Sequence, residues 1–194
     1  MIKPLPFDEL NTLKQYALED VQYTGTLSVK PKKMTDAVLD FLILAYLLGY
    51  EAVNETLGSN VKPVPEKQTE AIYKKVAGRS FDERVTEYSI SGSVEEIARV
   101  AETYMTRVYN QAVIDAAKEA EKENGQRLNK VWSTMLDEKV RDTHAYLEGM
   151  SVPLDAEFYT YDGDHAQAPC GFTSAENNCG CRCQLDIVPA PIEI

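Results

Sequence analysis

The residues WSTMLDEKVRDTHAYLEG, 132–149, decide how the carboxyl-terminal part of this chain folds, together with a short cysteine-rich segment, CGCRC, at 179–183. The first stretch contains the single tryptophan of the chain and, after it, an aspartate, an arginine and a histidine. A helix from Asp137 to Glu148 would place Arg141 and His144 about one turn apart, on neighbouring faces. The pattern therefore predicts a strand at 130–134, a turn, and a helix that carries these polar groups.

The two ends of this predicted helix carry residue types that favour helix termini. Asp137 is a favoured N-cap residue, and Gly149 is a favoured residue after the last turn. Val140, His144 and Leu147 would share one stripe of the helix, which turns the histidine toward the packed side. We therefore expect a histidine in the core.

The same residues carry a resemblance that extends toward the end of the chain. They are Trp132, Thr134, Asp137, Val140, Arg141, His144, Leu147 and Gly149, followed by Pro169 and then by Cys181, Arg182 and Cys183, with Arg107, Asn110 and Ala112 on a predicted helix upstream. In this order and spacing they resemble the carboxyl-terminal domain of the phage Mu F-like head morphogenesis family. The family usually reads Asn-Cys-Arg-Cys where Gly180 here replaces the asparagine. The resemblance covers the carboxyl-terminal half and hardly reaches the amino-terminal half.

This resemblance implies a function and a location. Members of the family are minor head proteins of tailed bacteriophages, which act in procapsid assembly beside the portal vertex and, in some members, in DNA packaging or ejection. The resemblance implies protein–protein binding to a portal, scaffold or major capsid protein, and a place in the virion, in the capsid interior or at the portal vertex, after assembly in the host cytoplasm. The motif residues would then hold the fold of the domain.

The composition of the chain limits the classes of partner that it can bind. The 194 residues, 44% of them hydrophobic, suffice for one sizeable core or two small ones, and the net charge of −11 disfavours generic DNA binding. The lysines around Pro31, and the pair Arg127 and Lys130, are local basic exceptions to this acidic surface. Such short clusters usually lie in solvated loops and bind nothing. The longest apolar run, 41–48, is too short to cross a bilayer, and we see no signal peptide. We therefore expect a cytoplasmic, membrane-free protein with reduced cysteines.

Helical periodicity dominates the first 125 residues. It predicts helices at 7–23, 35–55, 66–77, 80–88 and 93–124, and capping boxes at Ser80 with Glu83 and at Ser93 with Glu96. The segment 37–48 is apolar on nearly all sides, which predicts full burial, either in an amino-terminal bundle or against another chain. This segment, or the acidic segment from Met150 onward, is the expected contact with portal or scaffold.

After Gly125 the pattern changes to short extended pieces. Strands are predicted at 130–134, 151–154, 158–161 and 184–188, with a hairpin turn at Asp162-Gly163. The fold class is therefore α+β. We expect a mostly helical region at 1–92, a long connecting helix at 93–125, and a small α+β domain at 126–194 with a short antiparallel sheet.

Asp137, Arg141 and His144 allow an enzymatic interpretation as well. An acid, a guanidinium and an imidazole are parts of sites that act on nucleic acids or nucleotides, as an enzyme or toxin domain would. The simpler interpretation is that the acid caps its helix, the arginine pairs with a neighbouring strand and the histidine packs in the core. We favour the second, because no nucleophile or glycine-rich phosphate loop accompanies the three residues. We therefore expect a protein that is not an enzyme.

The cysteines raise the question of a metal. The candidate ligands are Cys170, Cys179, Cys181 and Cys183, with His144 or His165. Zinc sites usually pair cysteines two residues apart, and the spacing here differs. The alternative is that Cys181 and Cys183 are small buried hydrophobic residues on one face of a strand, with Arg182 pointing outward to an acid. We expect no bound cofactor and keep zinc as the alternative.

Overall fold

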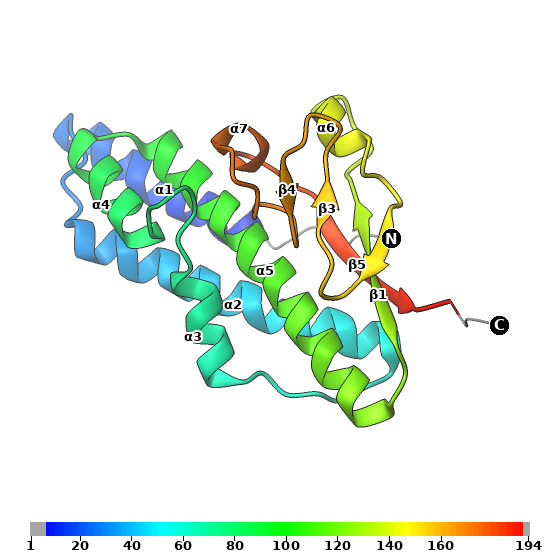
Figure 1. Ribbon diagram of the computed structural model, residues 1–194. Coiled ribbons are helices and arrows are strands. Elements are labelled where there is room, and N and C mark those ends of the chain that lie inside the picture. Colours follow the sequence, from blue (N-terminus) through cyan, green and yellow to red (C-terminus); the bar gives the residue numbers. More distant parts are fainter. Residues whose placement is uncertain (1–6, 192–194) are drawn as a thin grey trace.

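The computed structural model describes residues 7–191 and has the predicted α+β architecture (Figure 1). Five helices come first: α1 (Phe7–Thr24), α2 (Pro31–Leu57), α3 (Pro65–Tyr73), α4 (Phe81–Ser91) and α5 (Val94–Asn124). They agree with the predicted helices to within a few residues, except that α3 ends at Tyr73. After it, Val76 and Arg79 form an isolated β-bridge around Ala77, whose φ of 47° no helix contains.

The rest of the described chain alternates short strands with two single-turn helices. In order they are β1 (Leu128–Ser133), α6 (Asp142–Ala145), β2 (Ser151–Pro153), β3 (Phe158–Tyr159), β4 (His165–Ala166), α7 (Ala175–Asn178) and β5 (Gln184–Pro189). One sheet is antiparallel with strand order β2-β1-β5, and it pairs Trp132 with Leu185. β3 and β4 form the predicted hairpin around Asp162-Gly163.

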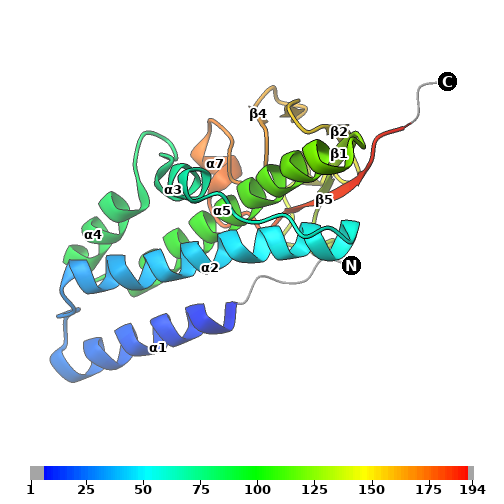
Figure 2. The ribbon, with the colours of Figure 1, turned by 90° about the horizontal axis from the view of Figure 1, so that it is seen from below.

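Helix α5 is the central element of the fold. It runs between α1 and α2 on one side and the strands on the other (Figures 1 and 2). It touches all four preceding helices as well as β1 and β5. Its residues join one continuous hydrophobic core that reaches from Leu13 to Ile187. The helix ends at Gly125, whose φ of 67° is the left-handed conformation expected after a last helical turn.

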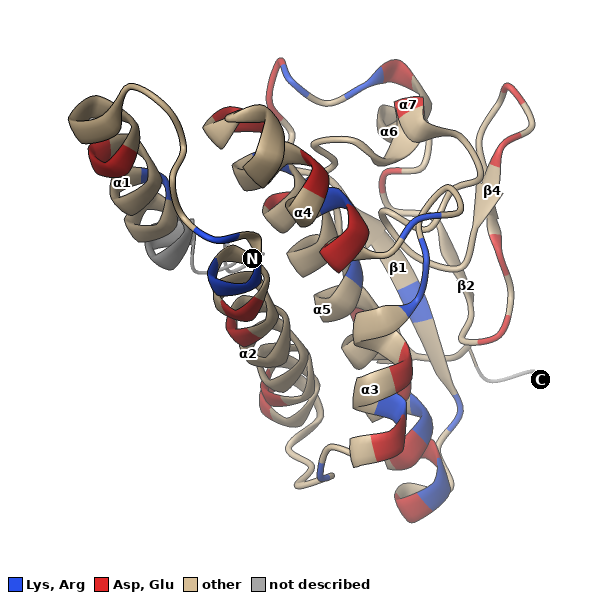
Figure 3. Ribbon diagram, turned by 90° about the vertical axis from the view of Figure 1, so that its left-hand side faces the viewer, with Lys and Arg blue, Asp and Glu red and all other residues tan. Residues whose placement is uncertain are grey.

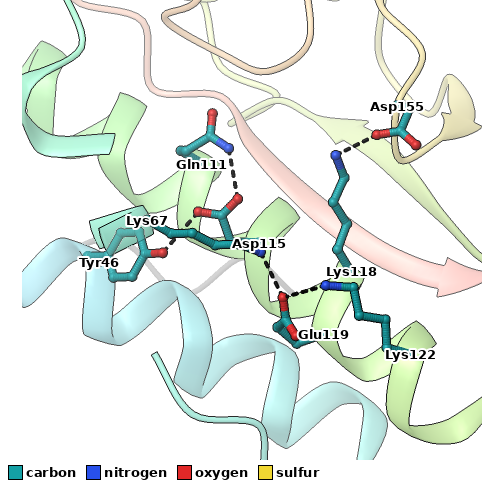
Figure 4. Close-up of polar contacts among 8 residues, drawn as sticks. All are labelled: Tyr46, Lys67, Gln111, Asp115, Lys118, Glu119, Lys122 and Asp155. Atoms are coloured by element: carbon teal, nitrogen blue, oxygen red, sulfur yellow. Dashed lines mark hydrogen bonds and ion pairs between the residues drawn. The ribbon is translucent and has the colours of Figure 1, made fainter. Parts of the chain in front are cut away.

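The closest approach between α2 and α5 depends on a glycine. A Cβ added to Gly49 would lie 2.6 Å from both the Ala112 Cβ and the Tyr109 carbonyl oxygen. Only a residue without a side chain allows the two backbones to approach this closely. Near this crossing, the buried Asp115 accepts hydrogen bonds from the Tyr46 hydroxyl at 2.9 Å and from Gln111 at 3.1 Å (Figure 4).

Two expectations about the helices are wrong. α2 is not buried on all sides, because Ile43 is 37% exposed and Leu47 is 45% exposed on the side away from the core. Helix α4 does begin with the predicted capping box, in which the Ser80 backbone N–H donates to Glu83 at 2.8 Å. Ser93, in contrast, makes no side-chain cap at the start of α5.

Charge is spread unevenly over the surface. Figure 3 shows acidic residues on α1, α2, α3 and α4, with a basic patch at the start of α2 where Lys30, Lys32 and Lys33 lie.

No helix within residues 7–191 combines the length and hydropathy needed to cross a membrane. One salt bridge, from Lys118 to Asp155, joins α5 to the loop after β2 (Figure 4).

Lys130 departs from its expected place on the surface. It lies in the middle of β1 with no exposed area, and its Nζ donates to the Leu154 carbonyl oxygen at 2.9 Å. The ammonium also lies 5.6 Å from the centre of the Phe158 ring. Burial lowers the pKa of Lys130 to about 8, because the charged form loses its hydration.

Lys130→Met is therefore expected to alter how stability depends on pH. The ordinary pKa is 10.5, so between pH 8 and 10.5 the unfolded state holds a proton that the folded state does not. Wild-type stability should rise with pH through this window, whereas the variant lacks this contribution. The free-energy difference between the two, ~1–3 kcal/mol in favour of the variant at pH 7, should shrink as pH rises. Urea denaturation at several pH values measures it.

Lys139→Met serves as the control, because Lys139 is exposed in the turn before α6. A difference between Lys130→Met and wild type that stays constant from pH 7 to 10.5 would contradict the assignment of a buried, charge-penalised lysine.

Candidate functional site

The centre of the carboxyl-terminal unit is a cluster of aromatic rings around Trp132. This side chain on β1 has no exposed area. Its ring meets His144, Phe158 and Phe172 with centroid separations of 5.7, 5.1 and 5.6 Å. His144 also stacks on Phe172 at 5.4 Å with an interplanar angle of 20°. The prediction that the histidine faces the core is therefore confirmed.

Two sulfur atoms lie close to the Nδ1 atom of the histidine ring. His144 Nδ1 lies 3.6 Å from Cys181 Sγ and 3.5 Å from Cys183 Sγ. These three ligand atoms lie within 4.8 Å of one another, and all three residues are buried. Cys170 has no exposed area, and its thiol donates to the carbonyl oxygens of Asn178 and Cys181, at 3.7 and 3.6 Å. We call these four residues, His144, Cys170, Cys181 and Cys183, the thiol–imidazole cluster.

The ionisation of the three thiols differs within this cluster. Hydrogen bonding from Cys170 lowers the pKa of the Cys181 thiol. Burial raises the pKa of Cys170, and the hydrogen bond to Cys181 raises the pKa of Cys183. Thiolates are the form in which cysteines bind metals.

Two of the sequence candidates stay outside the cluster. Cys179, one of the candidate ligands, is exposed. The reason is the turn at Gly180, whose φ of 67° reverses the chain between the two cysteines, so that this segment precedes β5 and is not part of it. His165 lies on β4, where it pairs with Glu157 at 3.0 Å and stacks on Tyr159.

Asn178 holds the loop that carries Cys170 against the segment that carries Cys181. Its side-chain amide donates to the carbonyl oxygens of Phe172 and Ser174, at 2.7 and 2.8 Å, and accepts from the Phe172 N–H at 2.9 Å. Its own carbonyl oxygen accepts from the Cys170 thiol at 3.7 Å. Pro169 is buried directly before Cys170, and Cys170 itself has a φ of 62°.

Asp164 is a second fixed point of this loop that the sequence did not single out. Its carboxylate accepts hydrogen bonds from the side chains of Thr173, Ser174 and Asn177, at 2.7, 2.6 and 2.9 Å. Partial burial alone would raise the pKa of Asp164, but these hydrogen bonds outweigh it and hold the pKa below its usual range. The loop therefore depends on side chains for its order, since it has almost no regular structure.

The predicted helix at 137–148 is wrong in its extent. Only Asp142–Ala145 is helical, with Arg141 at the N-cap position. The Asp137 carboxylate accepts from the Lys139 N–H at 3.1 Å and pairs with Arg182 at 2.7 Å, which holds it in a turn. Arg141 donates to the Cys179 carbonyl oxygen. The expected pairing of Arg182 with an acid is therefore present, and Asp137 supplies the acid.

The remaining motif residues close the end of β1. Thr134 is buried, and its backbone N–H donates to Glu148 at 2.6 Å. Gly149 has the left-handed φ of 72° expected of a residue after a helix, and its N–H donates to the Trp132 carbonyl oxygen at 2.8 Å. These contacts return the chain from α6 to β2 alongside β1.

Helix α5 reaches the cluster through Asn110. This fully buried amide donates to the carbonyl oxygens of Thr106 and Cys183, at 2.8 and 3.1 Å, and accepts from the Leu185 N–H at 2.8 Å. One side chain thus satisfies the backbone on both sides of residue 184, where β5 begins. The Gly180 N–H donates to the Thr103 hydroxyl, one more contact from the same helix.

Arg107 lies on α5 as well, almost fully buried. Its Nη2 donates to the carbonyl oxygens of Ala71 and Ile72 at 2.6 and 3.2 Å, while Nε and Nη1 have no partner among residues 7–191. Burial lowers the pKa of Arg107 to about 10, and the charge lies 5.3 Å from the Tyr104 ring. The guanidinium therefore stays positive at neutral pH.

Asn110→Ala is expected to lower the free energy of unfolding by ~2–4 kcal/mol, because it leaves the Leu185 N–H and the Cys183 carbonyl unpaired in the core. Asn124→Ala, at the exposed end of the same helix, should change it by less than ~0.5 kcal/mol. Urea denaturation compares the two. Equal effects would contradict the role given to Asn110.

Comparison with known proteins gives two partial relatives. A segment of 108 residues is 32% identical to NAD(+)--arginine ADP-ribosyltransferase EFV of Enterococcus faecalis (strain ATCC 700802 / V583), covering 55% of this chain and 22% of that protein. A segment of 58 residues is 34% identical to Minor head protein GP7 of Bacillus phage SPP1, covering 30% of this chain and 19% of that protein. The matches thus span about a fifth of each relative. No solved structure matches this chain.

The family model described as Phage Mu protein F like protein matches residues 55–186. This range begins at the end of α2, well before the segment in which the sequence motifs lie, and it contains α3, α4, α5 and the thiol–imidazole cluster. Because the match covers more than half of the chain, the chain belongs to the phage Mu protein F-like family.

Proposed function

We propose that this chain is a minor head protein of a tailed bacteriophage or prophage, which binds other head proteins near the portal during capsid assembly and contributes to DNA packaging or ejection. Family membership over residues 55–186 is the observation that carries this proposal. A relative named as a minor head protein supports it. The portal protein is the partner we favour over the scaffold and the major capsid protein.

The polar motif residues contact other parts of the protein, which supports a binding protein and not an enzyme. Asp137 pairs with Arg182, and Arg141 donates to a backbone carbonyl. His144 is 1% exposed and directs Nδ1 at two sulfur atoms. Each of the three residues therefore has an internal partner, as residues that hold a fold do.

Helix α2 offers the surface on which a partner would dock. Ile43 and Leu47 are exposed one turn apart, and Asp36, Asp40 and Glu51 continue the same face. We call these five residues the α2 stripe. An apolar centre with a polar rim is the usual composition of a protein–protein interface. The acidic rim would favour a basic patch on the portal.

The double variant Ile43→Glu/Leu47→Glu should reduce capture of the portal protein of the same phage by about tenfold or more, because charges replace the apolar centre of the α2 stripe. Ile90→Glu is the matched control, since Ile90 is 76% exposed on α4, away from the stripe. Its capture should equal that of wild type. Pull-down under assembly conditions measures all three proteins, with circular dichroism to verify folding. Failure of the wild-type chain to capture portal would contradict the proposal.

A second candidate function is a nucleic-acid- or nucleotide-directed enzyme or toxin domain that uses Asp137, Arg141 and His144. One observation favours it: the Enterococcus relative is named as an NAD(+)--arginine ADP-ribosyltransferase, although the match spans 22% of that protein. The two functions differ in what they require of Arg141.

Arg141→Ala distinguishes them. If Arg141 is structural, its loss removes a charged hydrogen bond to the Cys179 carbonyl and lowers the free energy of unfolding by ~1–3 kcal/mol. If it is catalytic, the melting temperature stays near that of wild type while turnover is lost. We expect the first result. The measurements are thermal melting and consumption of NAD(+) with an arginine acceptor; turnover by wild type that the variant abolishes would favour the enzyme.

A further inference from the structure

We propose that His144, Cys170, Cys181 and Cys183 bind one zinc ion in a closed, structural site of three thiolates and one imidazole. The proposal is independent of the partner that the chain binds. It reverses our expectation from the sequence that the chain holds no cofactor, and four features of the structure support it.

The first feature is the kind and number of ligands. Three cysteines and one histidine are a ligand set typical of structural zinc, and four protein ligands leave no open position for catalysis. They come from three separate segments: α6, the loop before α7, and the segment just before β5. Thiolate and imidazole together favour zinc over magnesium or calcium, which prefer oxygen ligands.

The second feature is distance. In a tetrahedral site with Zn–S near 2.3 Å and Zn–N near 2.0–2.1 Å, sulfur and nitrogen ligands lie ~3.6 Å apart. Nδ1 of His144 lies 3.6 Å from Cys181 Sγ and 3.5 Å from Cys183 Sγ. Both nitrogen–sulfur distances therefore match those that an ion requires. Cys170, whose thiol lies 3.6 Å from the Cys181 carbonyl oxygen, would turn toward these three atoms to complete the site.

The third feature is the arrangement of the sulfur atoms. Buried cysteines that serve only as small hydrophobic residues would direct their thiols at apolar neighbours. Here the thiols of Cys181 and Cys183 face a ring nitrogen, and that of Cys170 lies against the carbonyl oxygens of Asn178 and Cys181. Asn178 fixes the loop that brings Cys170 to this point.

The fourth feature is charge. A zinc ion with three thiolates and a neutral imidazole carries a net charge of −1, since 2 − 3 = −1. Arg107 is 4% exposed, and its neighbours are carbonyl oxygens and a tyrosine ring, not a carboxylate. A buried cation needs a compensating charge, and the thiolate-bound ion would supply it.

The ion would stabilise a part of the chain that has little regular secondary structure. α6 and α7 have four residues each, and the loop between β4 and β5 is ordered largely by the side chains of Asp164 and Asn178. A metal that joins three such segments contributes its binding free energy to folding. A small pocket lined by Val140, Arg141, Gly180 and Arg182 lies over the cluster and gives an ion or a chelator access.

The test uses the full chain, purified under reducing conditions without added metal, and elemental analysis of zinc. We expect about one zinc per chain, a lower melting temperature after chelation, and recovery with zinc alone. Replacement by cobalt(II) should give the absorption of a tetrahedral, thiolate-bound ion. A folded wild-type chain without zinc, which also fails to bind added zinc or cobalt, would overturn the proposal.

The chain supplies its own matched controls. Cys181→Ser and His144→Gln should reduce zinc to near none per chain, whereas Cys179→Ser and His165→Gln should keep it, because Cys179 is exposed and His165 pairs with Glu157. Zinc that survives Cys181→Ser, or that is lost with Cys179→Ser, would overturn the assignment. If the ligand variants do not fold, the cobalt spectrum of the wild-type chain still decides whether thiolates bind the metal.

Discussion

The buried amide of Asn110 is the contact on which the carboxyl-terminal unit depends. Backbone groups that enter a core must find partners, and at the start of β5 the Cys183 carbonyl and the Leu185 N–H both find theirs on α5. The same helix packs against α2, and the two backbones can approach each other because Gly49 has no side chain. A rigid α5 therefore fixes the helical layer and the sheet relative to each other, and the short strands need little stability of their own.

Local patterns in the sequence were sufficient for most of the fold and failed where distant residues decide. The period of α5 and its terminal glycine predicted its bounds, because helix formation and capping depend on neighbours a few residues away. The helix expected from Asp137 does not form there, although its carboxylate still accepts from the Lys139 N–H. Asp137 also pairs with Arg182, far along the chain, and no local pattern shows that contact. The exposure of Ile43 and Leu47 was also beyond a local pattern, since it depends on which neighbours α2 meets.

The site shows the same division. The sequence identified the residue types of the thiol–imidazole cluster but could not choose among four cysteines and two histidines. Gly180 makes that choice for Cys179: its left-handed backbone turns the chain so that Cys181 and Cys183 enter the core and Cys179 does not. Asp164 and Asn178 escaped notice because nothing in the sequence distinguishes a buried hydrogen-bonding hub from an ordinary loop residue until the segments around it are placed.

The family match includes the thiol–imidazole cluster but not the α2 stripe. Residues 55–186 contain α5, the aromatic rings around Trp132 and the thiol–imidazole cluster, whereas Ile43 and Leu47 precede the matched range. The matched part thus contains His144, the cysteines of the cluster and Asn110, whose polar groups are turned inward. The α2 stripe lies outside that part and faces outward. A surface that selects a partner can differ between relatives without altering the core, because an exposed helix face accepts substitution at little cost in stability. Leu42 and Tyr46 lie in the core on the packed face of the same helix, so α2 holds the fold with one face and leaves the other open to change.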